Sequence, residues 1–205
     1  MLLDVEIKQQ LEQYLALLEN DIVIKVSAGN DKVSTDMVVL IDEIARLSSK
    51  IHVEKAELDR TPSFAISRLN EDTGIVFAGI PLGHEFTSLI LALLQVGGRA
   101  PKVDETNIQR IEQLKGEYRF ETYISLSCHN CPDVVQALNI MSVVNPSITH
   151  TMIDGAVFKE EAESKDVMAV PAIYLNGKFF DNGRLTLEEI LDKLGQISDD
   201  SYINE

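Results

Sequence analysis

Apolar residues recur along the first half of the chain with two different spacings. Across residues 6–18 and 37–47 they return every three or four positions, which predicts two amphipathic helices. Residues 22–26 form a short continuous apolar run, typical of a buried strand, and a second short strand is expected at 51–53. The chain therefore begins as helix, strand, helix, strand.

The remainder of the first half predicts a hairpin and a closing helix. Two apolar runs, 63–67 and 75–78, are separated by turn-forming residues at 70–74, a strand–turn–strand signature. A helix is expected over 84–96, and a pair of glycines ends it. We place a linker at 97–101, where glycine and proline concentrate.

The second half repeats this order of elements without repeating the residues. The predicted elements are a helix at 106–114, a strand at 118–126, a helix at 132–144, a strand at 148–153, a short acidic helix near 158–162, a strand at 170–175, a hairpin turn at Asn176-Gly177, a returning strand at 178–180 and a helix at 186–194. We therefore predict an α/β chain with two units, 1–98 and 102–197, and a polar tail or linker at 198–205.

Reactive chemistry concentrates at Cys128-His129-Asn130-Cys131, which holds the only two cysteines among 205 residues. Two thiols at this spacing, with no other cysteine available for bridging, favour a reversible dithiol/disulfide. Half of a zinc site is one alternative, disfavoured because the other histidines supply no second pair at short spacing. A structural disulfide would close too small a loop to remove much unfolded-state entropy. Two inert buried cysteines fit poorly with the polar residues between them.

The residues that follow the motif predict how one thiol becomes reactive. Residues 132–144 have helical periodicity, and Pro132 suits the first turn of a helix. Cys128 is therefore expected at a helix N-terminus, where free amides and the macrodipole stabilise an anion. We assign Cys128 as the attacking thiolate and Cys131 as the resolving thiol. His129 either adds positive charge beside the thiolate or simply faces solvent.

Composition narrows the classes of partner. The chain carries 45% hydrophobic residues and a formal net charge of −15, spread over both halves. This acidity argues against nucleic acid as a partner, because binding to nucleic acid needs clustered Lys and Arg. No apolar run approaches the roughly 20 residues that cross a membrane, and residues 1–6 lack the features of a signal peptide. We expect a cytoplasmic protein, since a reducing compartment suits a cysteine pair that cycles.

The order βαβ, hairpin, helix, with a dithiol after the first strand, resembles the thioredoxin fold, here in tandem with a mixed central sheet flanked by helices. That fold places a cis-proline opposite the dithiol, and Val170-Pro171 occupies the matching position. The alternative is a trans Pro171 that merely starts a strand, although cis costs only about 0.5–1 kcal/mol. The backbone at Val170 would leave room for a substrate strand. Thr61-Pro62 stands at the same place in the first half, which has no cysteine and cannot exchange thiols.

Two longer segments resemble one family more closely. Residues 127–139 (SCHNCPDVVQALN) and 79–89 (GIPLGHEFTSL) are similar to the N-terminal region of AhpF, the flavoprotein component of alkyl hydroperoxide reductase, and the resemblance runs from the first helix to about Leu194. It implies two thioredoxin-like folds fused into one unit, with the redox pair only in the second. It also implies a dithiol that takes electrons from a flavoprotein portion supplied by NADH and passes them to the disulfide of a partner peroxiredoxin.

The same resemblance implies roles for individual residues. Cys128 would be the nucleophile, Cys131 the resolving thiol and Pro171 the cis-proline. Apart from the resemblance, we expect Val170 and His129 to contact the substrate. Glu85 would come from the first half to lie near the dithiol as a proton acceptor. A partly desolvated carboxylate can have its pKa raised into the range a base needs. The alternative is that Glu85 is an exposed acid on an amphipathic helix.

The sequence departs from that family where FAD- and NADH-binding domains would follow. No Gly-x-Gly-x-x-Gly segment occurs in the 205 residues. We therefore expect this chain to bind neither flavin, nicotinamide nor metal, and to be a fragment or separately expressed domain that needs an outside reductant. Two other functions stay open: a free-standing general protein disulfide reductase or isomerase, and a non-enzymatic adaptor with incidental cysteines.

Overall fold

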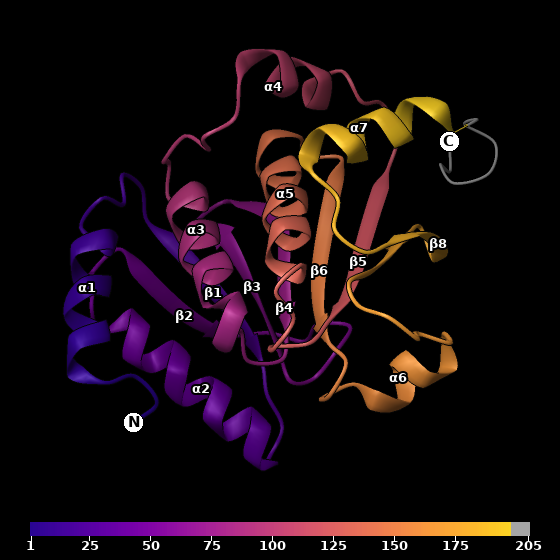
Figure 1. The fold of residues 1–205 in the computed structure, drawn as a ribbon. Coiled ribbons are helices and arrows are strands. Elements are labelled where there is room, and N and C mark those ends of the chain that lie inside the picture. The colour runs from indigo at the N-terminus through magenta and orange to yellow at the C-terminus, as the bar shows by residue number, and fades with distance from the viewer. Residues whose placement is uncertain (198–205) are drawn as a thin grey trace.

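A computed structural model describes residues 1–197 and shows one mixed eight-stranded sheet with helices packed on it (Figure 1). The predicted tail at 198–205 lies outside the described residues. The first half contains α1 (Val5–Leu15), β1 (Ile22–Ser27), α2 (Lys32–Ala45), β2 (Ile51–Lys55), β3 (Ser63–Arg68), β4 (Glu71–Ala78), the 3-10 turn η1 (Gly83–Glu85) and α3 (Phe86–Val96). The second half contains α4 (Glu105–Glu112), β5 (Tyr118–Ile124), α5 (Cys131–Val144), β6 (Ile148–Asp154), α6 (Lys159–Ser164), β7 (Ala172–Leu175), β8 (Lys178–Asn182) and α7 (Leu187–Gln196).

The sheet shows the predicted repeat directly. Its strand order is β2-β1-β3-β4-β6-β5-β7-β8, so each half contributes a parallel pair followed by an antiparallel hairpin. The halves join where β4 pairs in parallel with β6, from Ile75 opposite His150 to Ala78 opposite Ile153. Because the two repeats share one sheet, the division into 1–98 and 102–197 stays a prediction.

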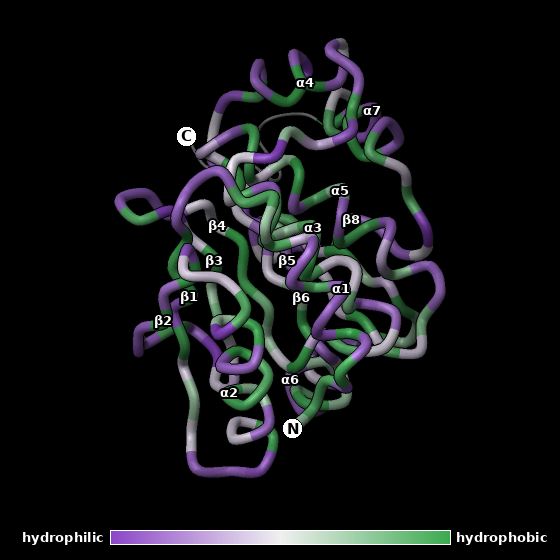
Figure 2. The backbone as a smooth tube through the Cα atoms, turned by 90° about the vertical axis from the view of Figure 1, so that its left-hand side faces the viewer, coloured by the Kyte–Doolittle hydropathy of each residue, from purple (hydrophilic) through white to green (hydrophobic). Residues whose placement is uncertain are grey.

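The apolar core also crosses from one half to the other. Along β5, Tyr118 and Phe120 face the cluster beneath α5 and α7, whereas Tyr123 faces the opposite side of the sheet. A second cluster joins residues of α1, α2 and α3 to Cys131 and Met152 of the second half. Helices α3 and α5 pack against each other above the seam between β4 and β6 (Figure 1). Figure 2 shows hydrophobic stretches along the central strands and polar residues gathered in the connections.

Two predicted boundaries shift because of contacts between distant parts of the chain. Helix α1 ends at Leu15 and not at residue 18, because the N–H groups of Glu19 and Asn20 both donate to the Gly97 carbonyl, each at 2.9 Å, and turn the chain towards β1. The predicted turn at 70–74 is too long: the turn lies at residues 69–70, and β4 already begins at Glu71. Gly74 lies inside β4 with φ +70°, and a Cβ there would come within 2.7 Å of Thr149 on the adjoining β6. Its missing side chain allows the halves to meet.

Three smaller differences concern the ends of elements near the cysteines. The helix predicted from residue 84 begins as the 3-10 turn η1 and becomes α-helical only at Phe86. Strand β5 ends at Ile124, two residues early, because the chain turns into the loop before Cys128. Strand β7 begins at Ala172, after Pro171, which has no N–H to give to the ladder. Within residues 1–197, the structure contains no helix long and apolar enough to cross a bilayer.

Candidate redox site

The two cysteines form a disulfide at the start of α5. Cys128 and Cys131 are bonded through their sulfurs, with their Cα atoms 5.5 Å apart. Cys131 is the first residue of the helix, Pro132 lies in its first turn, and Asn130 provides no side-chain cap. In place of a cap, the Cys131 N–H donates to Cys128 Sγ at 3.1 Å. The expected position of Cys128 at a helix N-terminus is confirmed, and a free amide points at its sulfur.

The two sulfurs differ in their access to solvent. Cys131 is fully buried in the cluster shared by the two halves, whereas Cys128 is only partly buried at the edge of that cluster. A partner disulfide can therefore approach Cys128 without rearrangement of the core, while Cys131 is reached only through Cys128. This asymmetry supports the predicted division into attacking and resolving thiols.

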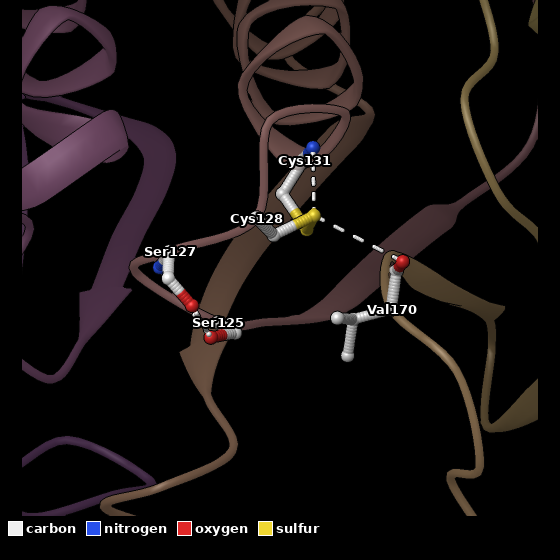
Figure 3. Close-up of a disulfide and its surroundings, with 5 residues drawn as sticks. All are labelled: Ser125, Ser127, Cys128, Cys131 and Val170. Atoms are coloured by element: carbon white, nitrogen blue, oxygen red, sulfur yellow. Dashed lines mark hydrogen bonds between the residues drawn. A yellow bond between two sulfur atoms is a disulfide. The ribbon is translucent and has the colours of Figure 1, made fainter.

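Val170 and Pro171 lie opposite the disulfide, as expected. The Val170-Pro171 bond is cis, so the alternative of a trans proline is wrong. The Val170 carbonyl oxygen is 3.9 Å from Cys128 Sγ, and Figure 3 shows it facing the sulfur across the site. Val170 is 36% exposed. The Thr61-Pro62 bond of the first half is also cis, at the equivalent place before the hairpin.

Glu85 is buried, so the alternative of an exposed acid on a helix surface is wrong. Its exposed fraction is 0%, and neither carboxyl oxygen has a well-formed hydrogen bond among the described residues. Burial raises the pKa of Glu85 to about 7, and the nearby Ser88 hydroxyl offsets only part of that rise. The turn η1 that carries Glu85 packs against α5. A carboxyl group able to exchange a proton near neutral pH is thus held against the helix that begins at Cys131.

His129 is exposed and contacts a second imidazole that no local pattern had indicated. The ring of His84, from the first half, lies 4.3 Å from the ring of His129, measured between centroids. The backbone N–H of His84 donates to the backbone carbonyl of Leu126 at 3.1 Å. Gly83 makes this approach feasible, since its φ is +57° and a Cβ there would lie 2.8 Å from the Leu126 oxygen. The contact could not be predicted from local sequence because the two histidines are far apart along the chain, although His84 lies in the segment 79–89 that resembles the family.

The zinc alternative gains no support from this geometry. Across residues 1–197, no three His, Cys, Asp or Glu side chains gather into a group that could hold a metal ion. The candidate residues that the fold does bring together are Cys128, Cys131, Val170 and Pro171. His129 lies at their edge, and Glu85 reaches α5 from the first half through η1.

Comparison with known proteins extends this description. A family model described as "Thioredoxin domain" matches residues 119–196. A crystal structure of the NTD_N/C domain of the alkyl hydroperoxide reductase AhpF from Enterococcus faecalis superposes with a TM-score of 0.87 at 30% identity, covering 94% of this chain and 99% of that one. Among curated relatives, a Bacillus subtilis protein named NADH dehydrogenase is 67% identical over 98% of this chain and 40% of its own length. The alkyl hydroperoxide reductase component AhpF of Staphylococcus epidermidis is 54% identical over 100% of this chain and 40% of its own length.

The repeated topology and the disulfide at the start of α5 together define a tandem thioredoxin-like thiol–disulfide oxidoreductase. The expected fold class is therefore confirmed. The chain belongs to the AhpF family of alkyl hydroperoxide reductase components and corresponds to the N-terminal domain of that family. It spans about two fifths of the length of the curated relatives it matches.

Proposed function

We propose that this chain is the dithiol electron carrier between a flavoprotein and a peroxiredoxin. In this proposal, a flavoprotein disulfide reductase portion, using NADH and FAD, reduces Cys128–Cys131, and the resulting dithiol reduces the disulfide of a partner peroxiredoxin. The observation that supports it most is a single half-buried disulfide at a helix N-terminus, opposite a cis-proline, in a chain of this family. The flavin and nicotinamide would be held by other domains.

The transfer takes place in two exchange steps. First, the Cys128 thiolate attacks one sulfur of the partner disulfide, so that a mixed disulfide forms and the other partner sulfur leaves as a thiolate. Next, Cys131 loses its proton and attacks Cys128 Sγ, which releases the second partner sulfur and restores Cys128–Cys131. Two electrons pass to the partner. The flavoprotein dithiol returns the carrier to its reduced form by the same two steps in the opposite direction.

Groups of this chain favour each step. The Cys131 N–H, which donates to Cys128 Sγ at 3.1 Å, would stabilise negative charge on that sulfur. Val170, which is 36% exposed beside the disulfide, would hold the partner segment next to the sulfurs through its backbone. Glu85 would accept the Cys131 proton, since both side chains are fully buried and a carboxyl with a pKa of about 7 is half ionised at neutral pH.

The test supplies the reduced protein to two oxidised substrates, a peroxiredoxin and insulin. We expect faster reduction of the peroxiredoxin, and no reduction of either substrate by Cys128→Ser. Equal or faster reduction of insulin would favour a general disulfide reductase. Titration of free thiols before and after a dithiol reductant provides the more basic check. A pair that never cycles would leave only the adaptor function.

A further inference from the structure

A charged cluster ties the redox-inactive half to the segment that faces the disulfide. Arg60 lies in the connection between β2 and β3, directly before the cis Thr61-Pro62 bond. Its Nε donates to both carboxyl oxygens of Glu161 at 3.0 Å, and its Nη2 donates to one of them at 2.6 Å. The same Nη2 also donates to Glu121. Three residues from three separate segments thus meet in one bidentate, charge-assisted arrangement.

The cluster lies on the face of the sheet opposite α5. Glu121 and Tyr123 alternate with the core residues of β5 and so project to this side. The Tyr123 hydroxyl donates to Glu161 at 2.7 Å. The side chain of Arg60 is 16% exposed, that of Glu121 11% and that of Glu161 26%. Charges this well shielded from solvent hold their geometry more strongly than exposed ion pairs do.

Electrostatics keep Arg60 and Glu161 ionised. Burial lowers the pKa of Arg60, but hydrogen bonds from Arg60 to Glu161 and Glu121 outweigh it and raise the pKa above its ordinary value. Burial likewise raises the pKa of Glu161, and the hydrogen bonds from Arg60 and Tyr123 bring it below the ordinary value. Removal of Arg60 would leave two adjacent carboxylates without their shared cation.

Helix α6, which carries Glu161, depends on such outside contacts. It has only six residues, none of them buried, and no side chain caps its N-terminus. A helix this short is unstable alone. Its flanking residues Phe158 and Val167, with Ala162, pack against a small apolar cluster around Tyr123 and Tyr174. Figure 1 shows α6 apart from the other helices, at the lower right of the molecule. Arg60, 101 residues away along the chain, contacts this helix through Glu161.

Helix α6 leads directly into the segment opposite the disulfide. The Tyr174 hydroxyl donates to the Lys165 carbonyl at 2.9 Å, and Asp166 adopts φ +52°, which turns the chain towards Val170. Met168 is 92% exposed, so the segment is held mainly at its ends. A displacement of α6 would therefore move the Val170 carbonyl, which lies 3.9 Å from Cys128 Sγ.

We propose that Arg60 is a positioning residue through which the redox-inactive half holds α6 and residues 165–171 in the geometry that receives a partner disulfide. The inference rests on the proposed function in its choice of substrate, an oxidised peroxiredoxin. Arg60 does not touch the sulfurs; it acts through Glu161. The first half, which lacks thiols of its own, thereby contributes to recognition in the second.

The test separates positioning from chemistry. Arg60→Met should raise KM for the oxidised peroxiredoxin by about tenfold, with kcat little changed, because a displaced docking segment loses binding that the ground state and the transition state share. Its rate with dithiodipyridine, a small disulfide that needs no docking segment, should equal that of the wild type. Hydrogen exchange should accelerate in peptides spanning 159–171. Arg60→Lys keeps the charge but not the bidentate hydrogen bonds, so its KM should lie between those of the wild type and Arg60→Met.

Two further variants keep the test decisive. Arg110→Met removes an ion pair of similar length, 2.6 Å to Asp192, far from this segment, and should leave both rates unchanged. Glu161→Gln keeps Arg60 paired with Glu121, so it should fold if Arg60→Met does not, with a smaller rise in KM. Equal loss on both substrates, or unchanged hydrogen exchange at 159–171, would overturn the proposal. If the wild type itself fails to reduce the peroxiredoxin, the proposed function fails, while hydrogen exchange still decides the role of Arg60.

Discussion

The two halves of the molecule treat the same structural position differently. In each half the first strand of the sheet ends, a short loop follows and a helix begins, with a cis X-Pro bond at the equivalent place before the hairpin. In the first half the Asp31 carboxylate caps α2 by accepting the Ser34 N–H at 2.9 Å. In the second half no side chain caps α5, and the Cys131 N–H instead donates to Cys128 Sγ at 3.1 Å.

This difference shows that the fold provides the electrostatics and the side chain provides the chemistry. The N-terminus of α2 stabilises an anion, since hydrogen bonds from Ser34 lower the pKa of Asp31 below its ordinary value. The N-terminus of α5 directs an N–H to the Cys128 sulfur in the same way. A carboxylate there is a permanent cap. A sulfur there can also exchange electrons. Without thiols, the first half contributes through the side chains it sends to the second: Glu85, His84 and Arg60.

The largest effect should come from removal of either sulfur of the active half. Cys128→Ser should abolish exchange with protein disulfides, because it removes the more accessible of the two thiols. Cys131→Ser should accumulate a mixed disulfide with the partner through Cys128, since no resolving thiol remains. Non-reducing electrophoresis and mass mapping of the linked peptide measure this. Trapping that instead requires Cys131 would reverse the two roles.

Glu85 should give the next largest effect, seen in the pH dependence of stability. Its folded pKa of about 7 lies above its ordinary value of 4.5, so the folded state holds the proton more tightly. The contribution of protonated Glu85 to the free energy of unfolding is then fully present below about pH 4.5. It is lost as the pH rises through 7, which lowers that free energy by up to about 3 kcal/mol. Glu85→Gln should remove that decline in denaturant unfolding followed from about pH 4 to about pH 8, a range that spans both pKa values.

A matched variant and a kinetic profile complete the Glu85 test. Glu12→Gln changes an exposed carboxyl on α1 and should leave the decline as in the wild type. If Glu85 accepts the Cys131 proton, Glu85→Gln should also lose the inflection near pH 7 in the rate of mixed-disulfide resolution. A stability change with an unaltered rate profile would show a buried acid without a role in proton transfer.

Gly83→Ala should have a moderate effect, because it disturbs the contact of η1 with the cysteine loop. Its φ of +57° and the 2.8 Å approach of a Cβ to the Leu126 oxygen predict a loss of about 1–3 kcal/mol in unfolding free energy. The exchange rate should fall as well. Gly195→Ala is the control. Gly195 lies in α7, a Cβ added there would have no neighbour from outside the helix within 4 Å, and the substitution should be neutral or slightly stabilising. Equal effects of the two substitutions would contradict the specific role of Gly83.

The smallest effect should come from the cap of the inactive half. Asp31→Asn keeps a capping oxygen but removes the charge at the N-terminus of α2. Because the folded pKa of Asp31 is lowered, its contribution to stability is present above its ordinary value of 3.8 and is lost as the pH falls below it. Thermal unfolding should show a lower midpoint for the variant at neutral pH and convergence with the wild type in acid. Exchange activity should not change.

Local pattern was sufficient for much of the fold and for the centre of the site. Most helices and strands of residues 1–197 lie where periodicity or an apolar run predicts one, and the dithiol follows from the spacing of the two cysteines. The proline opposite it follows from the resemblance to the thioredoxin fold. The residues that local pattern could not place are polar ones. Glu85, Arg60 and Glu121 have charged side chains, which a sequence pattern assigns to the surface. Their burial depends on contacts with distant parts of the chain, as with Arg60 and Glu121, 61 residues apart.

The sequence by itself therefore determined the repeated order of elements, the presence of a thiol pair in one half only, and the family. The order of elements and the position of the thiol pair depend on side-chain spacing within a few turns of one helix or along one strand. The family follows from the resemblance of residues 79–89 and 127–139. Only the tertiary structure decided that β4 pairs with β6 to make one sheet, that η1 buries Glu85 against α5, and that Arg60 reaches Glu161. Such contacts join segments distant in the chain, and their stability comes from desolvation and charge pairing that exist only once both partners are in place.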